Sequence, residues 1–273
     1  MRLSAWSVSD VGRVRAHNED SYLVVDSSGL FLVADGMGGH AGGAHASQAC
    51  VEVVAKVVQH GLTGLAGLDR DAASAAAKEL LGASASEASA RIYDRGQADS
   101  SLHGMGTTLT GLLFYRERAH VVHVGDSRCY LFRGGVASQL THDHTWLNEQ
   151  LRAGLVSAEE AETSDLKHII TRSVGFEREV QADLMTVNVC PGDAFLLCSD
   201  GMSNYIDTEE LMELAREHFV ADLPQVCVDL VLDRGGDDNV TVVTVMASNG
   251  TDRRVTNSSM HRTVADTVPL PSR

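Results

Sequence analysis

The strands expected in this chain come in runs and the helices come in pairs, which limits the folds that it can adopt. Apolar stretches typical of strands occur at about 3–9, 21–26 and 30–35, and two helical stretches follow at about 43–60 and 71–95. A regular βαβ alternation would build a parallel sheet, whereas grouped strands favour antiparallel sheets with helices packed outside them. We therefore predict an α+β layered architecture.

Strand character returns at residue 106. The segments GTTLTGLLFYR, AHVVHVG, RCYLFR and GVASQLT are predicted to form a four-strand meander, followed by a polar, partly helical insert at about 144–166. The other expected elements are strands at about 180–189 and 193–198, helices at 208–218 and 222–233, and a last strand at NVTVVTVMA. We assign residues 1–248 to one domain and predict that the polar residues 249–273 form a disordered tail.

The charge and the cysteines exclude several classes of function. A net charge of −15, from 37 acidic and 22 basic residues, disfavours nucleic-acid binding, which needs a basic face. No apolar run approaches the ~18 residues that cross a bilayer, and the first residues lack the apolar core of an export signal. The five cysteines form no CxxC pair, which is typical of reduced thiols. We expect a cytoplasmic protein that binds neither nucleic acid nor membrane.

Three apolar strands end in an aspartate that is followed by a small residue. These are Asp35 in LFLVADG, Asp126 in VVHVGDS and Asp200 in FLLCSDG. Two further acidic sites precede strands, and they carry Glu19 and Asp20 in HNEDS and Asp237 and Asp238 in GGDDNVTVV. Any one of them could simply form a turn. As a set they can converge on one sheet edge or one cleft, where carboxylates repel one another unless cations neutralise them.

The donor types indicate the metal. All of these ligands are oxygens, and there is neither a cysteine cluster nor a suitably spaced histidine pair, so we expect Mg²⁺ or Mn²⁺ rather than Zn²⁺ or copper. Two such ions about 3.5–4 Å apart can activate a water molecule and hold the oxygens of a phosphoryl group during displacement.

The glycine-rich segment GMGGHA after Asp35 has rival interpretations. It fits a dinucleotide-binding pattern by spacing, but Asp35 would lie where a pyrophosphate approaches, and the Gly-Lys-Ser/Thr of a Walker loop is absent. No cysteine is followed by arginine six residues later, which excludes a cysteine-dependent phosphatase, and no aspartate lies two residues after Asp35, as an aspartyl-phosphate enzyme would need. The glycines instead expose a backbone carbonyl and let ions approach the chain.

Seven motifs together resemble one family. DVGRVRAHNEDS, VADGMGGHAGG, GMGTTLT, VGDSRCYLFR, THDHT, LLCSDGMS and GGDDNVTVV occur in the order seen in bacterial metal-dependent serine/threonine protein phosphatases, the PPM or protein phosphatase 2C family. The resemblance runs from about residue 4 to residue 247. It implies a four-layer αββα sandwich, in which helix pairs flank two antiparallel sheets and a metal cleft lies between the sheets. It also implies hydrolysis of phosphoserine and phosphothreonine by metal-activated water, opposing a bacterial Ser/Thr kinase.

The resemblance also implies a role for each motif residue. Asp35 would bridge two metal ions, and Gly36 would contribute its carbonyl. Asp200 and Asp238 would complete the shell of the first ion, Glu19 would act on the second through water, and Asp126 would bind a third, weaker ion. Asp20 would orient ligands or waters, and Asn239 would support its loop. Arg15 stands at the position of the phosphate-binding arginine, with Arg13 as the alternative if the register is shifted.

Two features depart from the family pattern or extend beyond it. Many eukaryotic members have a histidine where this chain has Met37, so the general acid is unassigned and His40 is a candidate by proximity alone. The segment SDLKHIITRSVG lacks the usual His-Pro of the family's mobile flap, which leaves substrate selection there open.

The remaining expectations concern partners and the alternative function. We expect the protein to be a monomer. Thr263 in TVAD, once phosphorylated, has the Thr-x-x-Asp form that forkhead-associated domains bind, so such a domain is a candidate partner. The alternatives are a catalytically idle phosphatase-like module for binding or sensing, which would lack acidic ligands that are present here, and a partner-switching phosphatase, which would lack part of the NEDS and GMGGH set.

Overall fold

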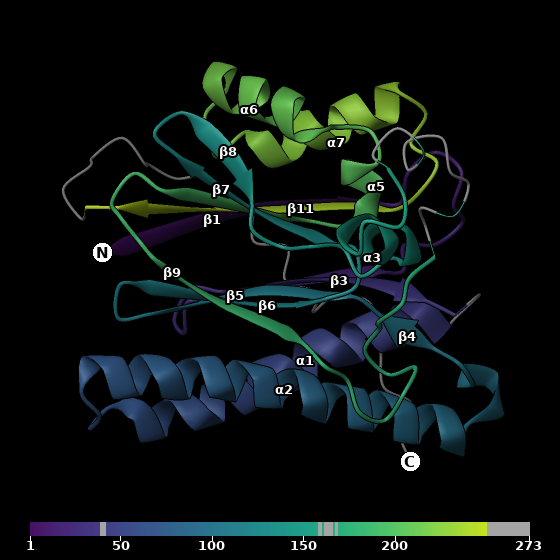
Figure 1. Cartoon of the computed structure of the whole chain (residues 1–273), viewed down its shortest axis with the longest axis horizontal. Coiled ribbons are helices and arrows are strands. Elements are labelled where there is room, and N and C mark those ends of the chain that lie inside the picture. Colours follow the sequence, from purple (N-terminus) through teal and green to yellow (C-terminus); the bar gives the residue numbers. More distant parts are fainter. Residues whose placement is uncertain (39–41, 158–159, 161–165, 167–168, 250–273) are drawn as a thin grey trace, which may run out of the picture.

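The computed structural model describes residues 1–38, 42–157, 160, 166 and 169–249. Two antiparallel sheets are stacked face to face, and a pair of helices covers the outer face of each (Figure 1). The predicted α+β sandwich of four layers is therefore confirmed. His40, residues 158–159 and 161–165 of the insert at 144–166, and the predicted tail from residue 250 lie outside the described residues. The boundary at 248 stays a prediction.

The first sheet, called here the β1 sheet, has the strand order β1-β11-β10-β7-β8. Its strands are β1 (Arg2–Asp10), β11 (Val240–Ser248), β10 (Ala194–Cys198), β7 (Arg128–Arg133) and β8 (Val136–Gln139). The helices α6 (Thr208–Glu217) and α7 (Leu223–Asp233) cover it at the top of Figure 1. Side chains from β10, β11 and both helices form one buried apolar cluster, which fixes these helices on the sheet.

The second sheet, called here the β2 sheet, has the order β2-β3-β5-β6-β9, and the short strand β4 pairs with β3. Its strands are β2 (Asp20–Val25), β3 (Leu30–Met37), β4 (Gly106–Thr107), β5 (Leu109–Tyr115), β6 (Arg118–Val124) and β9 (Asp183–Asn188). The long helices α1 (Gly42–Leu62) and α2 (Arg70–Ala98) cover it, joined by the 3₁₀ turn Thr63–Leu65. The remaining elements are α3 (Trp146–Arg152), α5 (Asp200–Ser203) and the 3₁₀ turn Ser100–Leu102.

The predicted four-strand meander after residue 106 is wrong. β5 and β6 belong to the β2 sheet, whereas β7 and β8 belong to the β1 sheet, so the chain crosses between the sheets after β6. The crossing begins at Gly125, whose φ of +105° is a backbone conformation that residues with a side chain rarely adopt. A hairpin turn and a crossing turn both need such a glycine, so the local sequence could not distinguish them.

Strand alternation explains how the sandwich produces a polar end. On β3, Phe31 and Val33 face the other sheet and are buried in the core between the sheets. Because side chains two residues apart share a face, Asp35 and Met37 continue the same row beyond that core. On β2, Tyr22 packs against the same core, and Asp20 continues its row. The acidic residues therefore extend from the end of the apolar core.

None of the described helices is long and apolar enough to cross a membrane.

Candidate active site

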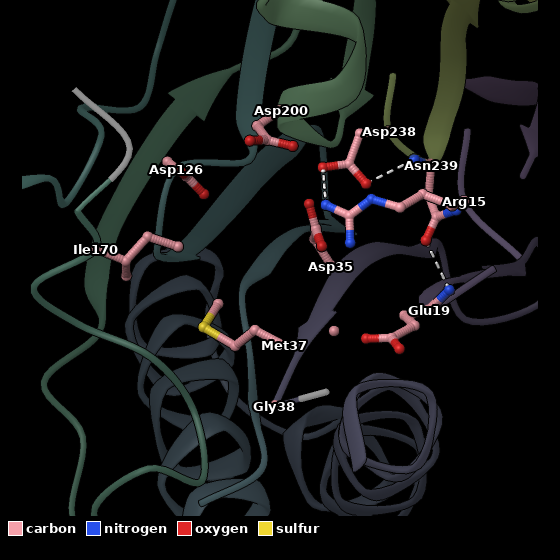
Figure 2. Close-up of a pocket in the computed structure, with 11 residues that line it drawn as sticks. Arg15, Glu19, Asp35, Met37, Gly38, Asp126, Ile170, Asp200, Asp238 and Asn239 are labelled. Carbon is pink, nitrogen blue, oxygen red and sulfur yellow. Dashed lines mark hydrogen bonds and ion pairs between the residues drawn. The ribbon is translucent and has the colours of Figure 1, made fainter. Parts of the chain in front are cut away.

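The acidic motifs converge on one cavity of about 310 Å³. Figure 2 shows the side chains that surround it. Its lining consists of Arg15, Glu19, Asp35, Gly36, Met37, Gly38, Asp126, Ile170, Asp200, Asp238 and Asn239. The structure thus brings together every predicted metal or phosphate residue. Gly38 and Ile170 are additions that the motif analysis did not supply, and Arg13 is not part of the lining.

Each carboxylate reaches the cavity from the end of an element. Asp35 is near the end of β3, Asp126 lies in the crossing turn after β6, and Asp200 begins α5 directly after β10. Glu19 and Asp238 come just before β2 and β11. Because these strands belong to two different sheets, the carboxylates face one another across the end of the sandwich.

Asp20 lies behind the cavity and ties the two sheets together. Its Oδ2 accepts hydrogen bonds from Thr241 Oγ1 in β11 at 2.7 Å and from Ser199 Oγ, directly after β10, at 2.8 Å. Its Oδ1 is buried and has no hydrogen-bond partner among the described residues. A buried acceptor without a donor is costly, so this oxygen is available for a cation or for a water bound to one.

Asn239 holds the loop that carries Arg15 and Glu19. Its Oδ1 accepts a hydrogen bond from the backbone N–H of Glu19 at 2.8 Å. Its Nδ2 donates to the carbonyls of Val11 at 2.9 Å and His17 at 3.0 Å. One side chain therefore fixes both ends of this loop against the start of β11.

The electrostatics of the cavity favour bound cations. Burial, followed by repulsion from neighbouring carboxylates, raises the pKa of Asp35 well above its usual value. Burial likewise raises the pKa of Asp20 to about 7, although the bonds from Thr241 and Ser199 oppose the rise. Burial and the nearby Asp200 raise the pKa of Asp126 to about 8. These groups resist ionising together, and a divalent cation would relieve that cost.

Arg15 supplies positive charge to the cavity. Its guanidinium donates to Asp238 Oδ2 at 2.8 Å, and more than half of its side chain is exposed. Among the described residues that line the cavity, it is the only cation. An exposed pair of this kind is weak, so Arg15 can leave Asp238 for an anionic ligand at little cost.

The donor set fits Mg²⁺ or Mn²⁺, although the ligands are not gathered at one point. Within the described ranges, no three His, Cys, Asp or Glu side chains are arranged to hold an ion as they stand. The carboxylates instead surround the cavity, and every candidate donor is an oxygen. The backbone at Gly36 is tightly enclosed, because a Cβ there would meet the Gly43 carbonyl and lie 2.6 Å from the backbone carbonyl oxygen of Glu19.

The turn that bears Asp126 is braced by the THDHT motif. The backbone N–H of Gly125 donates to His144 Nδ1 at 3.1 Å, and the N–H of His144 donates to the Gly125 carbonyl at 2.7 Å. Arg128 forms an ion pair with Asp143 at 2.7 Å. The motif therefore supports the turn through hydrogen bonds.

Tyr205 is a supporting residue that the motifs did not reveal. Its hydroxyl donates to Asp237 Oδ2 at 2.8 Å and accepts from the Asp237 N–H at 3.2 Å. Its carbonyl accepts a hydrogen bond from Arg234 at 2.6 Å. These bonds fix the turn that precedes Asp238, in which Gly235 and Gly236 both have positive φ. A tyrosine separated from the turn by about 30 residues gives no local signal of this contact.

Replacing Tyr205 with phenylalanine should therefore loosen this turn. We expect Mn²⁺ binding, measured by calorimetry, to weaken by about tenfold, because supporting hydrogen bonds orient the ligands of a metal. Tyr93→Phe, on α2, is the matched control and should bind Mn²⁺ as the unmodified protein does. Equal affinities in both variants would show that Tyr205 does not position Asp238.

Comparisons with known proteins agree with this arrangement. A family model described as protein phosphatase 2C matches residues 12–228. The serine/threonine protein phosphatase PstP of Mycobacterium tuberculosis is 38% identical over 86% of this chain, but the match spans only 43% of the length of PstP. The protein phosphatase PhpP of Streptococcus pneumoniae is 36% identical, and the match covers 87% of this chain and 95% of PhpP.

Solved structures give the same result. A crystal structure of the M. tuberculosis phosphatase PstP/Ppp superposes with a TM-score of 0.81 at 35% identity, covering 91% of this chain and all of that one. The catalytic domain of PstP in complex with two manganese ions has a TM-score of 0.77 at 35% identity, covering 90% of this chain and 99% of that one.

Proposed function

Because this chain belongs to the protein phosphatase 2C family, we propose that it hydrolyses phosphoserine and phosphothreonine in proteins with the help of Mg²⁺ or Mn²⁺. The observation that carries this proposal is the single cavity where five carboxylates surround one exposed arginine. A cluster of carboxylates alone would repel a phosphate. With divalent cations between them and Arg15 beside them, the same cluster attracts it.

The residues divide into those that would hold metal and those that would hold phosphate. Asp35 would be shared by two ions, and Gly36 would contribute its carbonyl. Asp200 and Asp238 would complete the shell of the first ion, Glu19 would act on the second through water, and Asp126 with Asp200 would hold a weaker third. When bound, the two main ions would activate a water molecule and neutralise the phosphoryl oxygens. Arg15 would leave Asp238 and donate two parallel hydrogen bonds to the phosphoryl group. Asn239 would hold the loop that keeps Arg15 and Glu19 in place.

The leaving oxygen of serine or threonine needs a proton. Met37 lines the cavity and has no proton to give. His40 lies outside the described residues and stays a candidate donor by its closeness in sequence to Asp35.

We propose that a cognate Ser/Thr kinase supplies the substrates. We also propose a monomer that acts in the cytoplasm, where its five free cysteines stay reduced. Docking of a forkhead-associated domain on phosphorylated Thr263 is a further proposal.

Hydrolysis of a phosphothreonine peptide tests the proposed activity. We expect phosphate release with Mn²⁺ and none with excess EDTA, because the carboxylates would then have no cation between them. The idle-module alternative predicts instead that the peptide binds in the presence of Mn²⁺ without releasing phosphate. Activity that persists in EDTA, or no activity in Mn²⁺, would contradict the proposal.

A further inference from the structure

The cavity has two chemically different sides. Arg15, Glu19 and Asn239 lie on the right in Figure 2, whereas Met37 and Ile170 lie on the left. The right side offers charge and hydrogen bonds to a phosphoryl group. On the left, Met37 and Ile170 are apolar and the reaction itself gives them no role, whereas Asp126, a proposed metal ligand, lies above them.

The apolar side continues outward to Phe176. Met37 pairs with Gly106 in the β3–β4 ladder, and a Cβ at Gly106 would lie 3.7 Å from the Cβ of Phe176. The N–H of Thr107, in β4, donates to the Val174 carbonyl at 3.0 Å, and the Thr107 carbonyl accepts from the Val174 N–H at 2.8 Å, which fixes the backbone before Phe176 beside β4. Met37, Ile170 and Phe176 are called here the apolar wall.

The exposure of this wall needs an explanation. Phe176 is 64% exposed, and Met37 and Ile170 are half-buried. Single exposed apolar residues are common, but several beside a polar cavity indicate a contact surface. Burying even part of a phenylalanine ring against another apolar group is favourable, so the wall has binding energy to offer to a substrate.

The spacing of the wall matches an extended peptide. Asp35 and Met37 are two residues apart on one face of β3, so the wall begins about 7 Å from a carboxylate of the phosphate site. An extended chain advances about 3.3–3.6 Å per residue. A side chain one or two residues from the phosphorylated residue would therefore reach the wall while the phosphoryl group lies near Arg15.

The charges near the wall do not suit an acidic substrate residue. Arg172 and Arg178, the two cations between residues 170 and 180, are paired with Asp183 and Asp94 at 3.1 Å. An acidic substrate residue would thus meet no unpaired cation in this segment and would face the carboxylates of the cavity. Glu177 and Glu179, both exposed and just after Phe176 in the sequence, add further negative charge beside the wall.

We propose that the apolar wall binds an apolar side chain of the phosphoprotein substrate, one or two positions from the phosphorylated residue. This inference rests on the proposed function. The apolar wall would select among phosphoproteins by the residue that flanks the phosphorylation site. Sites flanked by leucine or phenylalanine would be preferred over sites flanked by serine or aspartate.

Matched phosphothreonine peptides test this preference. Leucine, serine or aspartate is placed in turn at each of the two positions before and after the phosphothreonine, and kcat/KM is measured with Mn²⁺. At one position at least, leucine should exceed serine by about tenfold, as expected for one apolar side chain in an apolar subsite. Aspartate should be the poorest substrate there. Equal values for leucine and serine at all four positions would overturn the inference while leaving the proposed activity intact.

Variants locate the preference on the molecule. Phe176→Ser should bring the leucine-to-serine ratio close to one, because it removes the most exposed part of the wall. Phe219→Ser is the matched control, since Phe219 is 82% exposed and lies between α6 and α7, outside the cavity. The leucine-to-serine ratio of kcat/KM for Phe219→Ser should equal that of the unmodified protein. A ratio that survives Phe176→Ser would overturn the assignment, and no hydrolysis of any peptide would overturn the proposed function and this inference together.

Discussion

Replacing Asp35 with asparagine is expected to lower kcat for a phosphothreonine peptide by about 10³-fold, which corresponds to about 4 kcal/mol in the activation barrier. Asp35 is the carboxylate that continues the buried row of β3 into the cavity, where Asp20, Asp200 and Asp126 are close enough to raise its pKa. An amide keeps its shape but cannot bridge two cations as a carboxylate can. Calorimetry should show weaker Mn²⁺ binding to the variant.

The thermal stability of the metal-free Asp35→Asn variant should rise, although its activity falls. The pKa of Asp35 is raised by burial and by its acidic neighbours, so ionising it near neutral pH costs folding free energy. Above the usual carboxyl pKa this penalty grows with pH, and asparagine removes it. The metal-free variant should therefore melt at a higher temperature than the metal-free parent at pH 8. A gain in stability with a loss of activity excludes misfolding as the cause.

Asp26→Asn provides the control for this experiment. Asp26 is exposed in the turn between β2 and β3, at the other end of the same strand pair. That variant should keep both activity and metal binding. If Asp35→Asn retains more than about a tenth of the parent activity, the bridging role of Asp35 is wrong.

The sequence predicts the cavity well because its residues lie at the ends of strongly patterned strands. In LFLVADG, alternation places Asp35 on the same face as Phe31 and Val33, and the core between the sheets then fixes where that face points. The same reasoning applies to Asp20, which lies on the same face of β2 as Tyr22. The layered α+β architecture could be predicted because grouped strands favour antiparallel sheets with helices outside them, and the resemblance to the family supplied the four-layer sandwich.

What the sequence did not predict depends on contacts between distant segments. Gly125 could end a hairpin or begin a crossing to the other sheet, and only packing of β7 against β10 decides between them. Tyr205 meets Asp237 from about 30 residues away, and Phe176 reaches the cavity side only because Val174 pairs with Thr107. Such contacts leave no periodic pattern in the sequence.

Arg15→Ala should lower kcat/KM for the phosphothreonine peptide by about 10²-fold, or about 2.7 kcal/mol. Arg15 is the only cation among the described residues that line the cavity, and it is exposed enough to turn from Asp238 toward a phosphoryl group. A guanidinium can donate two parallel hydrogen bonds to a phosphoryl group, whereas an ammonium acts as a point charge. Arg15→Lys should therefore recover only part of the loss.

Arg13→Ala is the matched control, and it also tests the register of the motif. Arg13 is exposed, and its backbone N–H donates to the Gly236 carbonyl at 2.7 Å, a bond that alanine keeps. Its activity should stay within about twofold of the parent. If Arg13→Ala lost as much activity as Arg15→Ala, the phosphate would be bound by both arginines or by Arg13 alone.

A large rise in KM with Arg15→Ala would show that Arg15 binds the ground state, whereas a fall in kcat at constant KM would show that it acts mainly on the transition state.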